Sequence, residues 1–316
     1  MKNKEYILET LKRADDYLSG EDLAKDLHIS RAAIWQSIKS LRDDGYHIEA
    51  VTNRGYRLNE NYEALDEKTI ANRLEDPLKD VAILVKDKVD STNDAIFRED
   101  STHSFPSFSF MAAEEQTAGK GRVGHSFFSP FGTGLYLSTI IKEDACLDPG
   151  ILTMAAAVSV KEALREQSEA KVEIKWVNDL YLNHKKICGI LTEADFSGGR
   201  ARYVVGIGIN THTPKDAFKK QALNRAGSLQ EMVSRNQLAA DIMNRLWQWI
   251  HAPRGAVLDA YRKYNFTVGK TVRFSQGDIE YTGKATAIDD DGSLVVQVAD
   301  NTVRLSAGAI SVQGEW

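Results

Sequence analysis

A glycine-rich segment in the first half of the chain has the residue types of an anion-binding loop. Gly119, Gly121 and Gly124 alternate here with the cations Lys120 and Arg122. The backbone N–H groups of such a loop, together with the two cations, can surround a carboxylate that is being converted into an acyl phosphate. The alternative interpretation is an ordinary surface turn.

The glycine spacing also matches the G-x-G-x-x-G motif of dinucleotide-binding folds. In those folds the motif leaves a strand and opens a helix. Here Pro130, Gly132 and Gly134 follow closely, and these residue types exclude a helix at this place. The sequence therefore favours an anion-binding loop over a dinucleotide fold.

A second cluster lies further along the chain, where Lys186 precedes the apolar run Ile187–Leu191. A lysine at the edge of an apolar strand can be partly buried, and its cation can then neutralise charge that develops on a phosphate. The alternative is a solvated pair of Lys185 and Lys186 beside a hairpin.

A third cluster combines two hydroxyl groups and an amide in consecutive residues, Ser91, Thr92 and Asn93. These groups offer donors and acceptors to a polar neutral ligand, although such a run is more often an ordinary helix N-cap. The chain has no P-loop, no G-x-S-x-G, no H-E-x-x-H and no Cys/His metal spacing. We therefore predict neither a metal site nor a catalytic histidine.

The first 60 residues supply the elements of a winged helix-turn-helix. Apolar residues at helical spacing predict three helices, and Ser19 and Ser30 are suitable N-caps for the second and third. Gly45 ends the third helix, and β-prone runs at 47–51 and 55–58 with a turn between them predict a small hairpin.

The third of these helices has the charge of a DNA-binding surface, because no acidic residue occurs between Ser30 and Arg42. At its start, Ser30, Arg31 and Gln36 could contact base edges, and Lys39 and the wing residue Arg54 suit phosphates. One such unit makes a small interface, so we expect a dimer on an inverted repeat. A winged helix used for protein contacts is the alternative.

The rest of the chain predicts a mixed sheet followed by a small β-barrel. Between residues 63 and 267, strands follow one another after residue 170 without intervening helices, which favours a largely antiparallel or mixed sheet. From residue 268 onward, short strands separated by Gly-Asp and Asp-Gly turns predict the barrel. We predict an α+β protein with domains 1–62, 63–267 and 268–316.

Composition narrows the class of protein further. Forty basic and 45 acidic side chains give a net charge of -5, which excludes a globally basic nucleic-acid coat protein. The two cysteines, Cys146 and Cys188, are far apart and predict free thiols in a reducing cytoplasm. No apolar run reaches the roughly 18 residues that a membrane span requires. We expect a cytoplasmic protein without a membrane partner.

Taken together, these motifs resemble one family, the bifunctional biotin–protein ligases that also repress the biotin operon. The resemblance covers essentially the whole chain, and the order of the motifs is more specific than any one of them. The matching segments are residues 30–35 of the winged helix, Ser91–Asn93, Gly119–Gly124, Lys175–Asp179, Lys186–Leu191 and the C-terminal barrel.

The resemblance implies a class II synthetase-like ligase domain, an SH3-like barrel and a two-step reaction. Biotin and MgATP give biotinyl-5′-AMP, and a lysine of a biotin carboxyl carrier domain then takes the biotinyl group. Lys186, Arg122 and Lys120 are implied as catalytic. The implied biotin and ATP contacts are Ser91, Thr92, Asn93, Gln116, Gly119, Lys120, Gly121, Arg122, Trp176, Lys186 and Gly189. The adenylate is also the implied corepressor, which promotes a homodimer on operator DNA.

The chain departs from the family pattern at several of these positions. In the loop, Lys120 replaces an arginine, His125 another basic residue and Phe127 a tryptophan. A lysine keeps the charge but lacks the bidentate fork of arginine, so the loop would hold the adenylate less tightly.

Three further departures lie outside the loop. Val177 replaces a proline, Cys188 an alanine and Ala309 a glutamate. None of them removes a catalytic group. Three alternatives remain open: a lipoate–protein ligase, a biotin-sensing repressor without turnover, and a ligase whose winged helix does not bind DNA.

Overall fold

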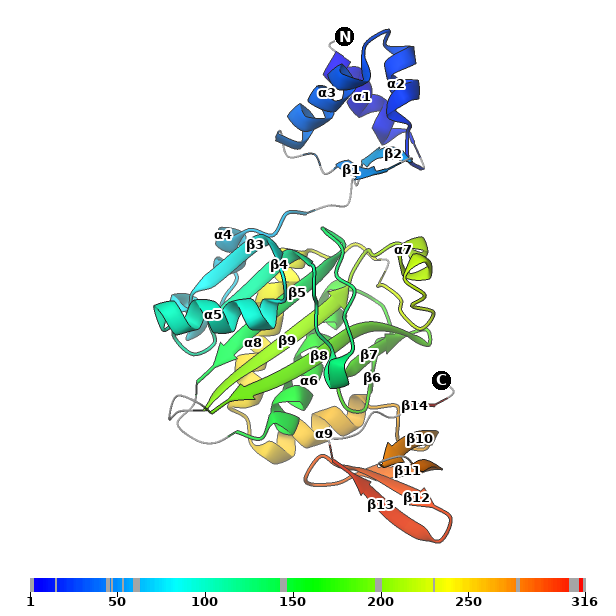
Figure 1. Ribbon diagram of the computed structural model, residues 1–316. Coiled ribbons are helices and arrows are strands. Elements are labelled where there is room, and N and C mark those ends of the chain that lie inside the picture. Colours follow the sequence, from blue (N-terminus) through cyan, green and yellow to red (C-terminus); the bar gives the residue numbers. More distant parts are fainter. Residues whose placement is uncertain are drawn as a thin grey trace. The chain divides into compact units, whose positions relative to one another are not determined.

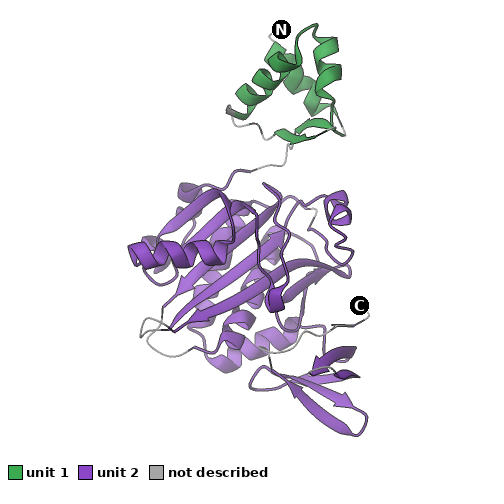
Figure 2. Cartoon of the chain, viewed as in Figure 1, with its two compact units in different colours: residues 1–62 green, residues 63–316 purple. Residues whose placement is uncertain are grey.

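The computed structural model divides the chain into two compact units, Met1–Tyr62 and Glu63–Trp316 (Figure 2). It describes residues 3–14, 16–43, 46, 48–52, 54–58, 63–142, 147–196, 201–229, 231–276, 279–306 and 313–314. Gly45, Asn53, Cys146 and Ala309, which enter the sequence predictions, lie outside the described residues.

The first unit is a helix-turn-helix followed by a two-stranded wing, as predicted (Figure 1). Its elements are α1 (Asn3–Lys12), α2 (Gly20–Asp26), α3 (Arg31–Asp43), β1 (Ile48–Val51) and β2 (Gly55–Leu58). The predicted caps are present: Ser19 Oγ accepts from the N–H of Glu21 at 3.1 Å, and Ser30 Oγ accepts from the N–H of Ala33 at 3.2 Å. Ile7, Ile34 and other buried apolar residues give the unit a core of its own.

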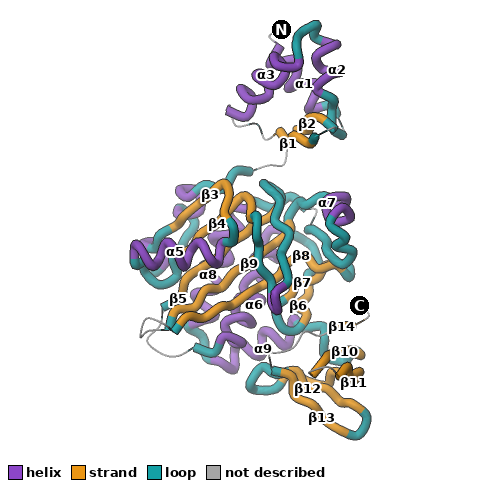
Figure 3. The backbone as a smooth tube through the Cα atoms, viewed as in Figure 1, coloured by secondary structure: helices purple, strands orange, loops and turns teal. Residues whose placement is uncertain are grey.

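The second unit is built on a seven-stranded mixed sheet with the strand order β3-β4-β5-β9-β8-β7-β6 (Figure 3). The strands are β3 (Ile83–Val89), β4 (Phe110–Gln116), β5 (Gly134–Ile141), β6 (Glu173–Lys175), β7 (Asp179–Leu182), β8 (Lys185–Asp195) and β9 (Arg202–Asn210). β3 and β4 pair in parallel, and the other neighbours pair antiparallel. The prediction of a mixed sheet is confirmed.

Helices cover the two faces of this sheet unequally. They are α4 (Glu67–Ala71), α5 (Thr92–His103), α6 (Pro149–Gln167), α7 (Lys215–Lys220), α8 (Arg235–Ile250) and α9 (Arg254–Tyr264). One face packs against α6 and α8 in the main core, and α5 packs on the opposite face through Ala95 and Ile96 (Figure 1). Because α5 covers only part of that face, the strands beside it are available for a site.

A small antiparallel sheet follows at the C-terminal end, with the order β13-β12-β11-β10-β14. Its strands are β10 (Thr271–Gln276), β11 (Ile279–Ile288), β12 (Leu294–Val298), β13 (Asn301–Leu305) and β14 (Gln313–Gly314). Val272, Phe274 and Leu294 join the same apolar core as α6 and α8. The predicted C-terminal β region is confirmed, and the boundary between residues 267 and 268 stays a prediction.

Four short or polar elements depart from the sequence analysis. The structure adds α5, α7, β7 and β14. The helical pattern of residues 65–74 forms a helix only over Glu67–Ala71. α5 has mostly polar residues and contributes few apolar ones to the core, so its helical pattern is weak. No helix among the described residues is both long and apolar enough to cross a membrane.

Candidate active site

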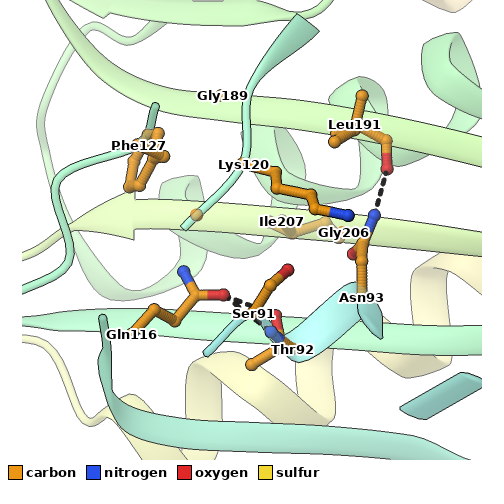
Figure 4. A pocket seen from close by; sticks show the side chains of 11 residues that line it. Ser91, Thr92, Asn93, Gln116, Lys120, Phe127, Gly189, Leu191, Gly206 and Ile207 are labelled. Atoms are coloured by element: carbon orange, nitrogen blue, oxygen red, sulfur yellow. Dashed lines mark hydrogen bonds between the residues drawn. The ribbon is translucent and has the colours of Figure 1, made fainter. Parts of the chain in front are cut away.

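A cavity lies on the sheet face beside α5 (Figure 4). Side chains from α5, from the ends of β4 and β8 and from the loop after β4 surround it. Its lining residues are Ser91, Thr92, Asn93, Gln116, Lys120, Phe127, Gly189, Leu191, Gly206, Ile207 and Gly208. The structure therefore brings the Ser91–Asn93 run, the glycine-rich loop and the strand after Lys186 to one place.

The floor of this cavity is formed by glycines on two neighbouring strands. Gly189 on β8 pairs with Gly208 on β9, and Gly206 lies two residues further along β9. A Cβ atom added at Gly206 would lie 2.1 Å from Asn93 Oδ1, and one at Gly208 would lie 2.7 Å from the ring of Phe127. The absence of side chains on the floor therefore creates the space above the sheet.

One wall is a connected set of hydrogen-bonding groups. Gln116 Oε1 accepts from the N–H of Thr92 at 2.8 Å, and Gln116 Nε2 donates to Ser129 Oγ at 2.8 Å. Ser138 Oγ lies 2.6 Å from both Thr92 Oγ1 and Asn93 Oδ1. These contacts fix the direction of each amide, so the wall presents donors and acceptors in a set pattern.

The far end of this wall depends on an acid that the sequence analysis did not identify. Asn93 Nδ2 donates to Glu193 Oε2 at 2.7 Å. Ser91 and Thr92 are almost fully buried beside Asn93. Neither Glu193 nor Ser138 belongs to a recognisable motif, and only the pairing of β4, β5, β9 and β8 brings them to the wall.

The glycine-rich loop folds back on itself over the cavity. The N–H of Gly121 donates to the carbonyl of His125 at 2.6 Å, and the N–H of Phe127 donates to the carbonyl of Gly119 at 2.7 Å. Lys120 Nζ lies 2.5 Å from Asp94 Oδ1, which ties the loop to α5. The loop is thus an ordered cover, and Figure 4 shows Lys120 reaching across the cavity.

Two cations lie at the other end of the floor. Lys186 Nζ is 2.6 Å from Asp179 Oδ1, and a Cβ at Gly189 would lie 3.1 Å from this nitrogen. Burial favours the neutral amine, but the Asp179 carboxylate outweighs it and raises the pKa of Lys186, which therefore stays charged. Arg122 Nη1 donates to Asn178 Oδ1 at 3.2 Å.

A second, larger cavity shares Phe127 with the first cavity. Lys186 lines the second cavity, and its Nζ lies 3.1 Å from where a Cβ of Gly189, a lining residue of the first cavity, would be. The other lining residues are His125, Ser126, Phe128, Tyr181, Asn210, Phe218, Ala222, Leu223, Asn224, Arg225 and Ala226. The sequence analysis did not find this cavity, because most of its wall comes from residues 218–226, which carry no motif.

The structure places two further residues away from the cavities. Trp176, which the sequence analysis assigned to the ligand pocket, lines neither cavity and donates its indole N–H to the carbonyl of Gly292 at 3.0 Å. Cys188 is fully buried, and burial raises the pKa of its thiol, which makes it a poor nucleophile. The Trp176–Val177 peptide is cis.

A substitution on the glycine floor tests the first cavity. Gly206→Ala is expected to weaken binding of a ligand there by roughly 30-fold, because the new methyl group displaces Asn93 at an overpacking cost of about 2 kcal/mol. The measurement is isothermal titration with biotin. Gly255→Ala is the matched control, since nothing lies within 4 Å of a Cβ at Gly255. Equal biotin affinities in the two variants would place the ligand elsewhere.

In the first unit, Ser30, Arg31, Gln36 and Lys39 are all exposed at or on α3. Arg54 lies on the wing and pairs with Asp16 at 3.0 Å. Trp35 belongs to the apolar pattern that predicts the third helix, but it is 56% exposed, and its ring lies 5.8 Å from Lys39 Nζ. All five predicted DNA contacts are exposed to solvent.

Comparison with known proteins assigns this combination of units to a family. Residues 85–210 match the biotin/lipoate A/B protein ligase family, residues 3–57 the HTH domain family and residues 267–312 the biotin protein ligase C-terminal domain. The bifunctional ligase/repressor BirA of Escherichia coli is 33% identical over 295 residues, which is 89% of this chain and 88% of the relative. The chain belongs to the bifunctional biotin ligase/repressor family.

A second relative and a solved structure also match large parts of the chain. BirA of Bacillus subtilis is 29% identical over 317 residues, 97% of each chain. The structure titled as biotin protein ligase from Aquifex aeolicus in complex with biotin and ATP has a TM-score of 0.64 at 22% identity, and the match covers 74% of this chain and 99% of that one. This likeness shows that the second unit has the ligase fold, which confirms the predicted fold class.

Proposed function

We propose that this protein joins biotin to a lysine of a biotin carboxyl carrier domain through biotinyl-5′-AMP, and that it represses biotin genes when the adenylate accumulates. The observation that carries the ligase half is the place of Lys186, which lines the second cavity and lies beside Gly189 on the floor of the first. A carboxylic acid in the first cavity and a nucleotide in the second would meet beside this cation. Its charge is maintained by Asp179.

In the first cavity, the ureido ring of biotin would lie against the polar wall. The ring is neutral and has two N–H donors and a carbonyl acceptor, which suit Ser91, Thr92, Asn93 and Gln116. The apolar part of biotin would cover the floor at Gly189 and Gly208. Biotin's carboxylate would then point toward Lys186 and Arg122.

In the second cavity, we place MgATP. The aromatic rings of Phe128 and Phe218 and the polar groups of Asn210 and Arg225 offer surfaces for a base, a sugar and phosphates. Mg²⁺ would arrive with the triphosphate and neutralise part of its charge. The described residues contain no group of three or more His, Cys, Asp or Glu side chains that could hold a resident metal ion.

The first step is adenylation. A carboxylate oxygen of biotin attacks the α-phosphorus of ATP, an acyl–phosphate bond forms, and pyrophosphate leaves with the electrons of the broken P–O bond. Lys186 and Arg122 would stabilise the negative charge that gathers on the phosphate oxygens. The closed Gly119–Gly124 loop, with Lys120, would keep water from the mixed anhydride.

The second step is transfer to the carrier domain. The neutral amine of the acceptor lysine attacks the acyl carbon, an amide bond forms, AMP leaves with the bonding electrons, and the amine proton passes to solvent. The exposed tip of the loop, where Val123 is 71% exposed, lies on the side from which an acceptor could approach. A carrier domain of a biotin-dependent carboxylase is the acceptor that we propose.

In the repressor half of the proposal, the adenylate acts as corepressor. We propose that it promotes a homodimer, and that the two winged helices contact an inverted repeat in operator DNA. Ser30, Arg31 and Gln36 would contact base edges, and Lys39 and Arg54 would contact phosphates. We also propose a cytoplasmic location and three functional parts, residues 1–62, 63–267 and 268–316.

Two substitutions on α3 distinguish base contacts from phosphate contacts. Arg31→Ala is expected to weaken binding to the promoter of the organism's biotin genes by about 1–3 kcal/mol, while binding to random DNA changes little. Lys39→Ala is expected to weaken binding to promoter DNA and to random DNA alike. It is also expected to lower the slope of log K against log salt concentration by about 1, the value for one phosphate contact. Fluorescence anisotropy with biotin and MgATP present measures each.

Lys12→Ala is the control, because Lys12 lies on α1, where it pairs with Glu9 of the same helix, and not on α3. If Arg31→Ala and Lys39→Ala bind the promoter as tightly as the wild type, α3 does not contact the DNA. The ligase half would be unaffected by that result.

A substrate comparison tests the ligase half. The full chain is given biotin or lipoate in parallel with MgATP, and pyrophosphate release is recorded. We expect pyrophosphate release in the reaction with biotin and none in the reaction with lipoate. The reason is that the polar wall matches a ureido ring, whereas lipoate's dithiolane ring has no amide groups. Pyrophosphate release with lipoate and none with biotin would make the protein a lipoate–protein ligase instead.

A further inference from the structure

Trp176 connects the C-terminal sheet to the turn between β6 and β7. Its indole N–H donates to the carbonyl of Gly292, which lies between β11 and β12, and the indole is only 2% exposed. Gly292 has φ +80°, and a Cβ there would lie 2.6 Å from Met154 Cε. The acceptor carbonyl is therefore held by close packing, which leaves the indole little freedom.

Neighbouring contacts hold the same turn from the same side. The N–H of Trp176 donates to Thr267 Oγ1 at 2.9 Å, and the hydroxyl of Tyr261 donates to the carbonyl of Val177 at 2.9 Å. Arg262 Nε on α9 donates to the carbonyl of Ile288 at 2.8 Å, which fixes the strand leading to Gly292. The start of the turn is thus anchored to α9 and the C-terminal sheet.

The other end of this turn holds the two cations of the site. Asn178 Oδ1 accepts from Arg122, and its Nδ2 donates to the carbonyl of Ile190 at 2.8 Å. Asp179 pairs with Lys186. Only one residue separates Trp176 from Asn178, so a displacement of the indole would be passed directly to the partners of Arg122 and Lys186.

From these contacts we infer that Trp176 is a positioning residue for the adenylation step. The hydrogen bond of Trp176 to Gly292 lets the C-terminal sheet hold Asn178 and Asp179 in position. Asn178 and Asp179 in turn position Arg122 and Lys186. This inference rests on the proposed ligase function. The polar wall for the ureido ring is built on α5, β4, β5 and β8 and does not include Arg122 or Lys186. The effect of Trp176 therefore falls mainly on the nucleotide step and much less on biotin binding.

The test compares Trp176→Phe with the wild-type chain. Phenylalanine keeps an aromatic ring in the core but removes the N–H donor. We expect kcat/KM for ATP to fall roughly tenfold in biotin-dependent ATP–pyrophosphate exchange, since misplaced catalytic groups are costly even when the chemistry is intact. The Kd for biotin, measured by titration calorimetry, is expected to stay within about twofold of wild type.

The matched control is Trp249→Phe. Trp249 Nε1 donates to Glu162 Oε2 at 3.0 Å between α8 and α6, away from the turn. Both variants lose one indole hydrogen bond and are expected to lose similar thermal stability. Only Trp176→Phe is expected to change the ATP kinetics, so a purely structural role predicts equal effects in the two variants.

A double-mutant cycle with Asn178→Ala shows whether Trp176 acts through the turn. We expect the losses in kcat/KM for ATP to be clearly less than additive. If Trp176→Phe does not fold, Arg262→Gln tests the same anchor from the surface, and the same selective loss is expected. Unchanged ATP kinetics in an active, folded variant overturns the inference, whereas a wild-type chain without exchange activity overturns the proposed function instead.

Discussion

Replacing Lys186 with alanine is expected to lower the rate of biotinyl-adenylate formation by about 10²–10³-fold, the usual cost of removing one group that stabilises transition-state charge. The reason is the position of its ammonium group in the second cavity, beside Gly189 of the first cavity and 2.6 Å from Asp179. Without the lysine, the carboxylate of Asp179 is left unpaired beside the reacting phosphate and repels it. Biotin-dependent ATP–pyrophosphate exchange measures the loss.

Lys185→Ala is the matched control for this prediction. Lys185 is the preceding residue and has the same charge, but it is exposed and donates to the carbonyl of Asn224 at 2.7 Å. We expect its exchange rate to stay within about threefold of wild type. Comparable losses in the two variants would mean that net charge near the cavity matters and that Lys186 has no special role.

The second large effect concerns stability. Glu114→Ala is expected to lower the free energy of unfolding of the second unit by about 3–5 kcal/mol, because it leaves the buried charge of Arg235 without its partner. Arg235 Nη1 lies 2.6 Å from Glu114 Oε2, and both side chains are at most 3% exposed. Glu114 Oε1 also accepts from the N–H of Leu65 at 2.8 Å. The substitution therefore also releases the segment that follows the first unit.

Urea unfolding followed by far-UV circular dichroism checks this prediction, with Glu115→Ala as control. Glu115 is the next residue of β4, and it pairs with the exposed Lys88 at 3.0 Å. Exposed ion pairs contribute at most about 1 kcal/mol, so the control is expected to unfold near the wild-type midpoint. Equal shifts of the urea midpoint in Glu114→Ala and Glu115→Ala would show that the buried Glu114–Arg235 pair stabilises the second unit no more than an exposed pair does.

Local sequence signals were sufficient for the elements that form most of the core. Pro149–Gln167, Gly134–Ile141 and Arg235–Ile250 have long apolar patterns, and these patterns predict a helix, a strand and a helix at the same places. In the first unit, Ser19 and Ser30 cap helices as expected from their residue types. Apolar spacing and helix caps depend only on residues close together in the chain, so they can be recognised from the sequence without knowledge of the tertiary structure.

Elements and site residues that depend on distant contacts could not be predicted in this way. α7 and β7 are short, and α5 is largely polar, so each forms because the rest of the unit supports it. Glu193 and Ser138 join the polar wall through strand pairing alone. Trp176 lies inside a recognisable motif, yet its hydrogen bond to Gly292 spans more than a hundred residues and carries no sequence signal.

The central claim, ligation of biotin to a carrier domain, is tested most directly by intact-mass spectrometry. A biotin carboxyl carrier domain is incubated with the full chain, biotin and MgATP, and a parallel reaction omits ATP. The account predicts a mass gain of one biotinyl group on the carrier only when ATP is present, and its loss when the acceptor lysine is replaced. An unmodified carrier, in spite of measured biotin binding, would contradict the account and leave a repressor that senses biotin without transferring it.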